Sequence, residues 1–134
     1  MDLNALIEKA DEARAFSYSP YSHYAVGAAV LTDDERIFIG ANIENAAYPS
    51  GMCAERCALF HAYMHGYKKE NLKALAIFAD GEGLPYPCGA CRQVIGELFP
   101  LDAPIVIANK KGEKLVSDIR GLLPYIFDES NLKA

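Results

Sequence analysis

The chain has 134 residues, of which 51% are apolar, so it can bury one hydrophobic core but is too short for two ordinary domains. Its formal net charge is −5 and its 13 Lys and Arg are scattered, which argues against an extended phosphate-binding surface and favours a small substrate over a nucleic-acid duplex. We therefore predict a single domain over residues 1–134 that has no nucleic-acid partner.

Helices and short strands alternate along the chain. The helices are predicted from apolar residues at helical spacing, and the strands from short apolar runs bounded by turn residues. In chain order, the predicted elements are helix 3–16, strand 26–31, strand 37–41, helix 53–65, strand 74–79, helix 91–99, strand 105–108, strand 114–116 and a short helix capped by Asp118 that ends near Pro124. The first two strands form a hairpin at Asp33-Asp34, and Gly66 is expected at the end of the second helix. Because two connections run strand, helix, strand, we predict an α/β fold whose sheet is sandwiched by helices.

The chain carries no sign of a membrane segment. Its first residues, Met1-Asp2-Leu3-Asn4, have no basic lead or long apolar run, and no segment is long and apolar enough to cross a bilayer. A cytoplasmic protein without a membrane partner is therefore predicted.

Two short segments carry the candidate chemistry: Cys53-Ala54-Glu55 and Pro87-Cys88-Gly89-Ala90-Cys91. Both lie where a loop enters a predicted helix, and the exposed amides and helix dipole there favour the thiolate, which is the form of cysteine that binds metal. Three ligands, Cys53, Cys88 and Cys91, leave the fourth position of a tetrahedral zinc open to water, and Glu55 can carry a proton of that water. The two segments thus predict a catalytic site with one Zn²⁺ per chain.

Other interpretations of the four cysteines stay open. Disulfides are disfavoured in a reducing compartment, and a redox dithiol at Cys88-x-x-Cys91 leaves Cys53 and Glu55 unexplained. Cys57 lies one helical turn after Cys53, so all four thiolates can instead form a closed structural zinc site. Cys57 is otherwise a small apolar residue of the helix, and Glu55 is otherwise a partner of the helix dipole.

Arg56 and Arg92 are candidates for tuning the charge of this site. Three thiolates outweigh the charge of one Zn²⁺, which weakens the metal as a Lewis acid, and a guanidinium that donates to the sulfurs offsets this effect. The alternative for Arg56 is a solvated surface side chain. The three histidines, at positions 23, 61 and 65, have no ligand-like spacing to the cysteine pairs, and ordinary polar roles are expected for them.

Several longer segments carry a resemblance to a known family: Pro20-Tyr21-Ser22, Val26-Gly27-Ala28-Ala29, Asn42-Ile43-Glu44-Asn45-Ala46-Ala47-Tyr48, Cys53-Ala54-Glu55-Arg56 and Pro87-Cys88-Gly89-Ala90-Cys91-Arg92-Gln93. Through them most of the chain resembles the small homotetrameric cytidine deaminases, and Cys-x-Glu followed by Pro-Cys-x-x-Cys is similar to the zinc-deaminase signature. The resemblance implies a three-layer α-β-α sandwich with a mixed sheet of about five strands. It also implies zinc-dependent hydrolysis of cytidine and 2′-deoxycytidine to uridine and 2′-deoxyuridine, with release of ammonia, in pyrimidine salvage.

The resemblance also implies a role for each site residue. Cys53, Cys88 and Cys91 are implied to hold zinc, and Glu55 is implied to move protons to ring N3 and then to the departing amine. The implied substrate-binding residues are Asn42, Glu44, Tyr24, Ala54, Ala46, Tyr48 and Phe127. Asn42 and Glu44 hold the ribose 3′-hydroxyl in this scheme, and the backbone at Ala54 reads the pyrimidine edge. Ala46, Tyr48 and Phe127 reach into the site of a neighbouring subunit of a homotetramer.

Two positions depart from the family pattern, and other functions remain possible. Tyr24 stands where the family usually has Phe, which puts a hydroxyl near the expected ribose, and Cys57 replaces a residue that is usually not cysteine. Asn42 and Asn45 can instead be turn residues and Phe127 a core residue. The rival functions are a deaminase of another amino heterocycle, such as a blasticidin-type enzyme, and a zinc-stabilised binding module without turnover. The Asn-x-Glu-Asn-Ala stretch favours the nucleoside enzymes.

Overall fold

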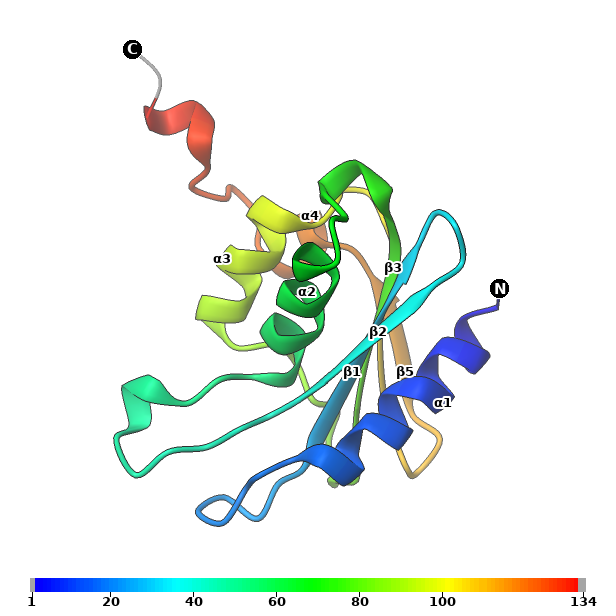
Figure 1. The fold of residues 1–134 in the computed structure, drawn as a ribbon, viewed down its shortest axis with the longest axis vertical. Helices are drawn as coiled ribbons and strands as arrows, with labels where there is room; N and C mark the ends of the chain where they lie inside the picture. Colours follow the sequence, from blue (N-terminus) through cyan, green and yellow to red (C-terminus); the bar gives the residue numbers. More distant parts are fainter. Residues whose placement is uncertain (1, 133–134) are drawn as a thin grey trace.

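The computed structural model describes residues 2–132, which form a five-stranded sheet covered by helices on both faces (Figure 1). The strands are β1 (Val26–Thr32), β2 (Ile37–Ala41), β3 (Leu72–Ala79), β4 (Ile105–Asn109) and β5 (Lys114–Ser117), and the helices are α1 (Leu3–Ala13), α2 (Ala54–Met64), α3 (Gly89–Leu98) and α4 (Ile119–Leu122). The spatial order is β2-β1-β3-β4-β5, with β3 parallel to β4 and every other pair antiparallel. This arrangement confirms the predicted three-layer α-β-α sandwich with a mixed sheet.

Each face of the sheet carries its own apolar core. Alternate residues of a strand point to opposite faces, so Ala28 and Val30 pack toward α2 and α3, whereas Ala29 packs toward α1. In β3, Leu75 and Ile77 belong to the first core and Ala76 to the second. Because helices cover both faces, the strands are continuous apolar runs, as the sequence shows for β3 and β4.

The position of α2 depends on a close approach to β2 at Gly40. A Cβ at Gly40 would lie 2.3 Å from the backbone nitrogen of Ala58, so only glycine lets the helix come this near to the strand. This close contact sets the distance between α2 and the sheet. It thereby fixes the place of Cys53 and Glu55, which lie at the N-terminal end of that helix.

The predicted element bounds agree with the structure to within one or two residues, with local differences at the helix ends. The predicted helix 3–16 is α1 followed by a 3₁₀ turn, Arg14–Phe16. The helix predicted from residue 91 begins at Gly89, because Cys88 takes the N-cap position. Gly66 follows α2 with φ of +91°, as expected for a helix-ending glycine.

The segment after α4 leaves the sandwich and ends in a 3₁₀ turn, Glu129–Leu132, which lies apart from the sheet at the red end of the chain in Figure 1. Its aromatic side chains Tyr125 and Phe127 are exposed. Among residues 2–132, no helix combines the length and the hydrophobicity that crossing a membrane requires.

Candidate active site

The N-terminal ends of α2 and α3 bring three cysteines together. Cys53 is the N-cap residue of α2, Cys88 is the N-cap residue of α3, and Cys91 lies in the first turn of α3. The three sulfur atoms all lie within 4.8 Å of one another, and Cys53 Sγ is 3.9 Å from Cys88 Sγ. Neither N-cap side chain accepts a capping hydrogen bond from the backbone amides of its own helix, so both sulfurs can face a common ion.

This cluster fits a tetrahedral zinc ion. Zn–S bonds of about 2.3 Å at tetrahedral angles hold two sulfurs about 3.8 Å apart, close to the separation found between Cys53 and Cys88. Thiolates are ligands that zinc accepts readily. Three protein ligands also leave one coordination position for water or substrate, which distinguishes a catalytic zinc site from a structural one.

Cys57 does not join the cluster, so the geometry of the described residues favours three thiolate ligands over the four-thiolate structural site. The physical reason is that Cys53, at the N-cap, has extended backbone angles (φ −82°, ψ 156°), so the rule that residues four apart share a helix face does not apply to the pair. Cys57 instead faces β2, where its Cβ would be 2.8 Å from a Cβ at Gly40. Burial raises the pKa of its thiol.

Arg56 contacts the cluster. Its Nη2 donates to Cys53 Sγ at 3.6 Å, and its Nε is buried without a partner among residues 2–132, which leaves it a free donor. A hydrogen bond from the Cys91 thiol and the bond from Arg56 hold the pKa of Cys53 well below its usual range. The bond to Cys53 and burial raise the pKa of Cys91. Zinc binding would replace the protons that remain on the cluster.

Arg92, the second arginine predicted beside the sulfurs, makes its hydrogen bonds elsewhere. Its Nε donates to the Pro87 carbonyl at 2.7 Å and its Nη1 to the Leu122 carbonyl at 2.6 Å. Arg92 therefore connects the loop that precedes Cys88 to the end of α4. In this geometry it supports the second cysteine segment through the backbone.

Glu55 is a buried carboxyl group beside the cysteines. Only 4% of the residue is exposed. Desolvation by burial, reinforced by the charge on Cys53, raises the pKa of Glu55 to about 7. A carboxyl group with this pKa exchanges a proton readily near neutral pH.

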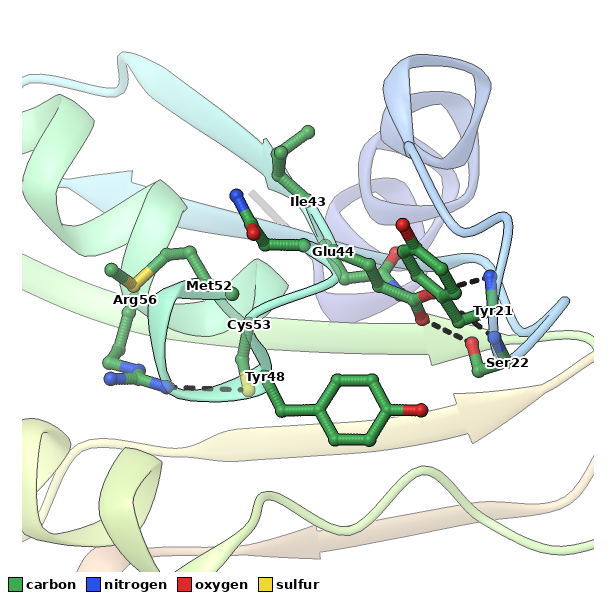
Figure 2. A pocket seen from close by; sticks show the side chains of 11 residues that line it. Tyr21, Ser22, Ile43, Glu44, Tyr48, Met52, Cys53 and Arg56 are labelled. Atoms are coloured by element: carbon green, nitrogen blue, oxygen red, sulfur yellow. Dashed lines mark hydrogen bonds between the residues drawn. The ribbon is translucent and has the colours of Figure 1, made fainter.

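A cavity of about 400 Å³ opens next to Cys53 (Figure 2). Its lining residues come from the loop after the first 3₁₀ turn, from the segment after β2 and from the start of α2: Tyr21, Ser22, Asn42, Ile43, Glu44, Asn45, Tyr48, Gly51, Met52, Cys53 and Arg56. Figure 2 shows Arg56 and Cys53 at one end and Tyr21, Ser22 and Glu44 at the other, with the Tyr48 ring between them. Cys53 of the metal cluster and the polar residues Asn42 and Glu44 therefore line one cavity, whereas Cys88, Cys91 and Glu55 are not among its lining residues.

Asn42 and Glu44 are both held by the loop that precedes β1. The Asn42 side chain donates to the Tyr24 carbonyl at 2.8 Å and accepts from the Val26 amide at 2.9 Å and from Ser17 Oγ at 2.6 Å. Glu44 Oε1 accepts from the amides of Tyr21 and Ser22 at 3.0 and 3.1 Å, and its Oε2 accepts from Ser22 Oγ. The Ser22 hydroxyl, its amide and the Tyr21 amide lower the pKa of Glu44, which therefore stays ionised.

The other predicted substrate residues differ in where they lie and in how far they are exposed. Tyr48 lies on the cavity wall, 77% exposed, with its ring edge-on to Tyr21 at 6.3 Å between centroids. Ala54 is buried at the first turn of α2, and Ala46 is exposed next to the cavity segment. Phe127 is 58% exposed, and its carbonyl accepts from Gln93 Nε2 at 2.5 Å.

The Tyr24 side chain is not among the cavity-lining residues. Its ring lies against Gly81, where a Cβ would come within 2.9 Å of it, and its pKa is raised by burial and by the charge of Glu55. The backbone carbonyl of Tyr24, not its hydroxyl, contacts Asn42.

Sequence reasoning missed the two serines that hold the polar pair. Ser17 lies just after the first predicted helix and Ser22 lies in one of the segments that resemble the family, but no residue spacing signals which side chains the two serines will meet. Their partners Asn42 and Glu44 are more than 20 positions away. Met52 and Ile43 were likewise not predicted as cavity residues.

Comparisons with known proteins agree with this geometry. The family model for the cytidine and deoxycytidylate deaminase zinc-binding region matches residues 1–106. A cytidine deaminase of Sporosarcina psychrophila is 45% identical over 132 residues, covering 98% of this chain and 96% of that protein. One from Halalkalibacterium halodurans is 43% identical over 132 residues, covering 98% of each. The 1.6 Å crystal structure of cytidine deaminase from Burkholderia pseudomallei superposes with a TM-score of 0.92 at 44% identity, over 95% of this chain and all of that one.

Proposed function

Because this chain belongs to the cytidine and deoxycytidylate deaminase family, we propose that its thiol cluster and cavity form an active site that deaminates both cytidine and 2′-deoxycytidine by hydrolysis. The products are uridine and 2′-deoxyuridine, with release of ammonia, and the role is pyrimidine salvage. The observation that carries the proposal is the buried Glu55 carboxyl beside three cysteines that fit zinc, one of which, Cys53, lines a cavity.

The remaining hydrogen-bonding capacity of Asn42 and Glu44 suits a sugar hydroxyl. The Asn42 side-chain oxygen already accepts two hydrogen bonds, and its NH₂ group donates one, so one N–H is left to donate. The Glu44 carboxylate can only accept, and Oε2 has capacity left. A hydroxyl donates once and accepts, so a ribose hydroxyl placed between the two satisfies both. This supports the assignment of Asn42 and Glu44 to the 3′-hydroxyl.

The proton transfers are assigned to Glu55. Its burial sets a pKa of about 7, so the carboxylate can take a proton from water and the resulting acid can release it near neutral pH. Delivery of that proton to ring N3 makes C4 electrophilic, and the hydroxide left by that water adds to C4. A second proton transfer, to the amine, then lets the C4–N bond break and releases ammonia. One side chain thus acts first as base and then as acid.

Cys53, Cys88 and Cys91 would hold the zinc, one ion per chain. The bound ion supplies Lewis-acid chemistry, which lowers the pKa of water toward about 7. Arg56 donates to Cys53 Sγ and offsets the negative charge of the thiolates. The amide and carbonyl at Ala54, in the first turn of α2 next to Cys53, are assigned to the pyrimidine edge.

We further propose a homotetramer in which subunits share their sites. The cavity is open to solvent beside Tyr48, and an enclosed reaction needs additional walls. Ala46, Tyr48 and Phe127 are exposed, and Phe127 lies on a segment that leaves the sandwich, so they are available to a neighbouring subunit. The whole chain is proposed to act as one cytoplasmic domain without a nucleic-acid partner.

The test is a spectrophotometric assay of cytidine and 2′-deoxycytidine with zinc content and ammonia release measured on the same sample. Loss of cytidine absorbance with one zinc per chain supports the proposal. Zinc-loaded protein that turns over neither nucleoside would indicate a binding module, and turnover confined to another amino heterocycle would indicate the blasticidin-type alternative. Glu55→Gln protein is the matched control for contaminating activity.

A further inference from the structure

Ser17 makes a short hydrogen bond to the side chain of Asn42. Ser17 Oγ is 2.6 Å from Asn42 Oδ1. It is also 3.2 Å from Ser19 Oγ and 3.2 Å from the Asn42 carbonyl. A hydroxyl has one proton to donate, so the shortest contact identifies Asn42 Oδ1 as its acceptor.

The surrounding backbone fixes which way the Asn42 amide points. The Val26 amide can only donate and the Tyr24 carbonyl can only accept, so the side-chain oxygen must face Val26 and the side-chain nitrogen must face Tyr24. With Ser17 added, both lone pairs of Oδ1 are used. The free N–H is then the only group that Asn42 can offer to a ligand.

From this saturation we propose that Ser17 is a positioning residue that makes Asn42 act on the substrate as a donor only. The inference rests on the proposed function, because it concerns the sugar hydroxyl assigned to Asn42 and Glu44. Without Ser17, one lone pair of Oδ1 is open to water or to the proton of the sugar hydroxyl. The sugar hydroxyl could then donate its proton either to Asn42 Oδ1 or to the Glu44 carboxylate. The Asn42 side-chain amide would also lose one of the hydrogen bonds that hold its orientation.

Removing the Ser17 hydroxyl should leave the surrounding loop in place. The backbone of this segment is bound independently: Ser17 N donates to the Arg14 carbonyl at 3.1 Å, Tyr18 N to the Asn42 carbonyl at 3.0 Å, and Glu44 N to the Tyr18 carbonyl at 2.8 Å. Ser17 has extended backbone angles (φ −65°, ψ 141°), which threonine also adopts. The chain therefore accepts both a Ser17→Ala variant and a hydroxyl-retaining Ser17→Thr variant.

The experiment compares zinc-loaded parent and Ser17→Ala enzyme on cytidine and on 3′-deoxycytidine, which lacks the hydroxyl that Asn42 would bind. For cytidine, Ser17→Ala should raise KM and lower kcat/KM by roughly two- to tenfold, the size of one hydrogen bond, with kcat little changed. For 3′-deoxycytidine, the same substitution should have little effect. The ratio of the two kcat/KM values should therefore fall, and this ratio does not depend on how much of the enzyme is folded.

Two further variants separate positioning from a general effect on the loop. Ser19→Ala removes a hydroxyl from the same loop that has no bond to Asn42 and should keep the parental substrate ratio, while Ser17→Thr should restore it. An active Ser17→Ala enzyme with the parental ratio would overturn the inference and leave the proposed function intact. A parent enzyme that deaminates neither nucleoside would overturn both.

Discussion

Cys53 Sγ and Cys88 Sγ lie 3.9 Å apart although the two residues are 35 positions apart in the sequence. The contact exists because α2 and α3 start at the same edge of the sandwich and each begins with one of these cysteines. A reactive metal site at two helix N-termini gains from both helix dipoles, which stabilise the thiolates. The fold thus brings the sulfur atoms together at a place where the helix dipoles favour the metal-binding thiolate form.

Zinc binding should require Cys53, Cys88 and Cys91 but not Cys57. Cys57→Ser is expected to keep one zinc per chain and near-parental turnover, because Cys57 faces β2. Cys53→Ser, Cys88→Ser and Cys91→Ser should each lose zinc and activity, because an open three-ligand site needs every ligand. Metal analysis of the purified variants measures this. Zinc loss in Cys57→Ser equal to that in Cys53→Ser would restore the closed four-thiolate site.

Replacing Glu55 should separate metal binding from catalysis. Glu55→Gln removes the proton carrier and keeps the volume of a buried side chain, so zinc content and thermal stability should stay near those of the parent. General acid-base catalysis contributes about 10²–10⁴-fold per step, and Glu55 is assigned more than one step, so kcat should fall by at least this factor. Steady-state kinetics with zinc analysis test the assignment, and an active Glu55→Gln enzyme would refute it.

Glu44 should titrate below the ordinary range of a glutamate because the Ser22 side chain and the loop amides stabilise its charged form. A lowered pKa in the folded state means that this contribution to folding is present at pH values above the pKa of Glu44 in the unfolded chain and is lost as pH falls through the folded pKa. Carboxyl-carbon NMR titration of the parent and of Ser22→Ala measures the effect. The Ser22 substitution should raise the pKa of Glu44, with Ser19→Ala as the unchanged control. Equal pKa values in parent and Ser22→Ala would show that the hydroxyl contributes nothing.

The exposed aromatic near the C-terminal end should matter for substrate binding in an assembled enzyme. Light scattering is expected to give the mass of a tetramer, and Phe127→Ala should still assemble but show a raised KM for cytidine. Stacking on one base is worth about 1–3 kcal/mol, or roughly five- to 150-fold in kcat/KM. Tyr125→Ala, which removes a neighbouring exposed aromatic, is the matched comparison. A fully active monomer, or parental kinetics in Phe127→Ala, would mean that one chain builds the whole site.

The sequence by itself determined the features that depend on neighbours along the chain. Helical spacing and apolar runs located the helices and strands, since these patterns follow directly from local geometry. The spacing Cys88-x-x-Cys91 and the pair Cys53-x-Glu55 indicated the metal ligands and the nearby carboxyl for the same reason. The arrangement in three layers followed from helices that must cover both faces of an apolar sheet.

Only the tertiary structure decided which side chains meet across the fold. Sequence spacing left Cys57 as a possible ligand, and the extended backbone of Cys53 at the N-cap together with the close approach at Gly40 turned Cys57 toward β2. The burial that raises the pKa of Glu55, and the contact of Ser17 with Asn42, likewise come from packing between distant segments. Such contacts depend on where the backbone brings each residue in space, and no local pattern of residues encodes that position.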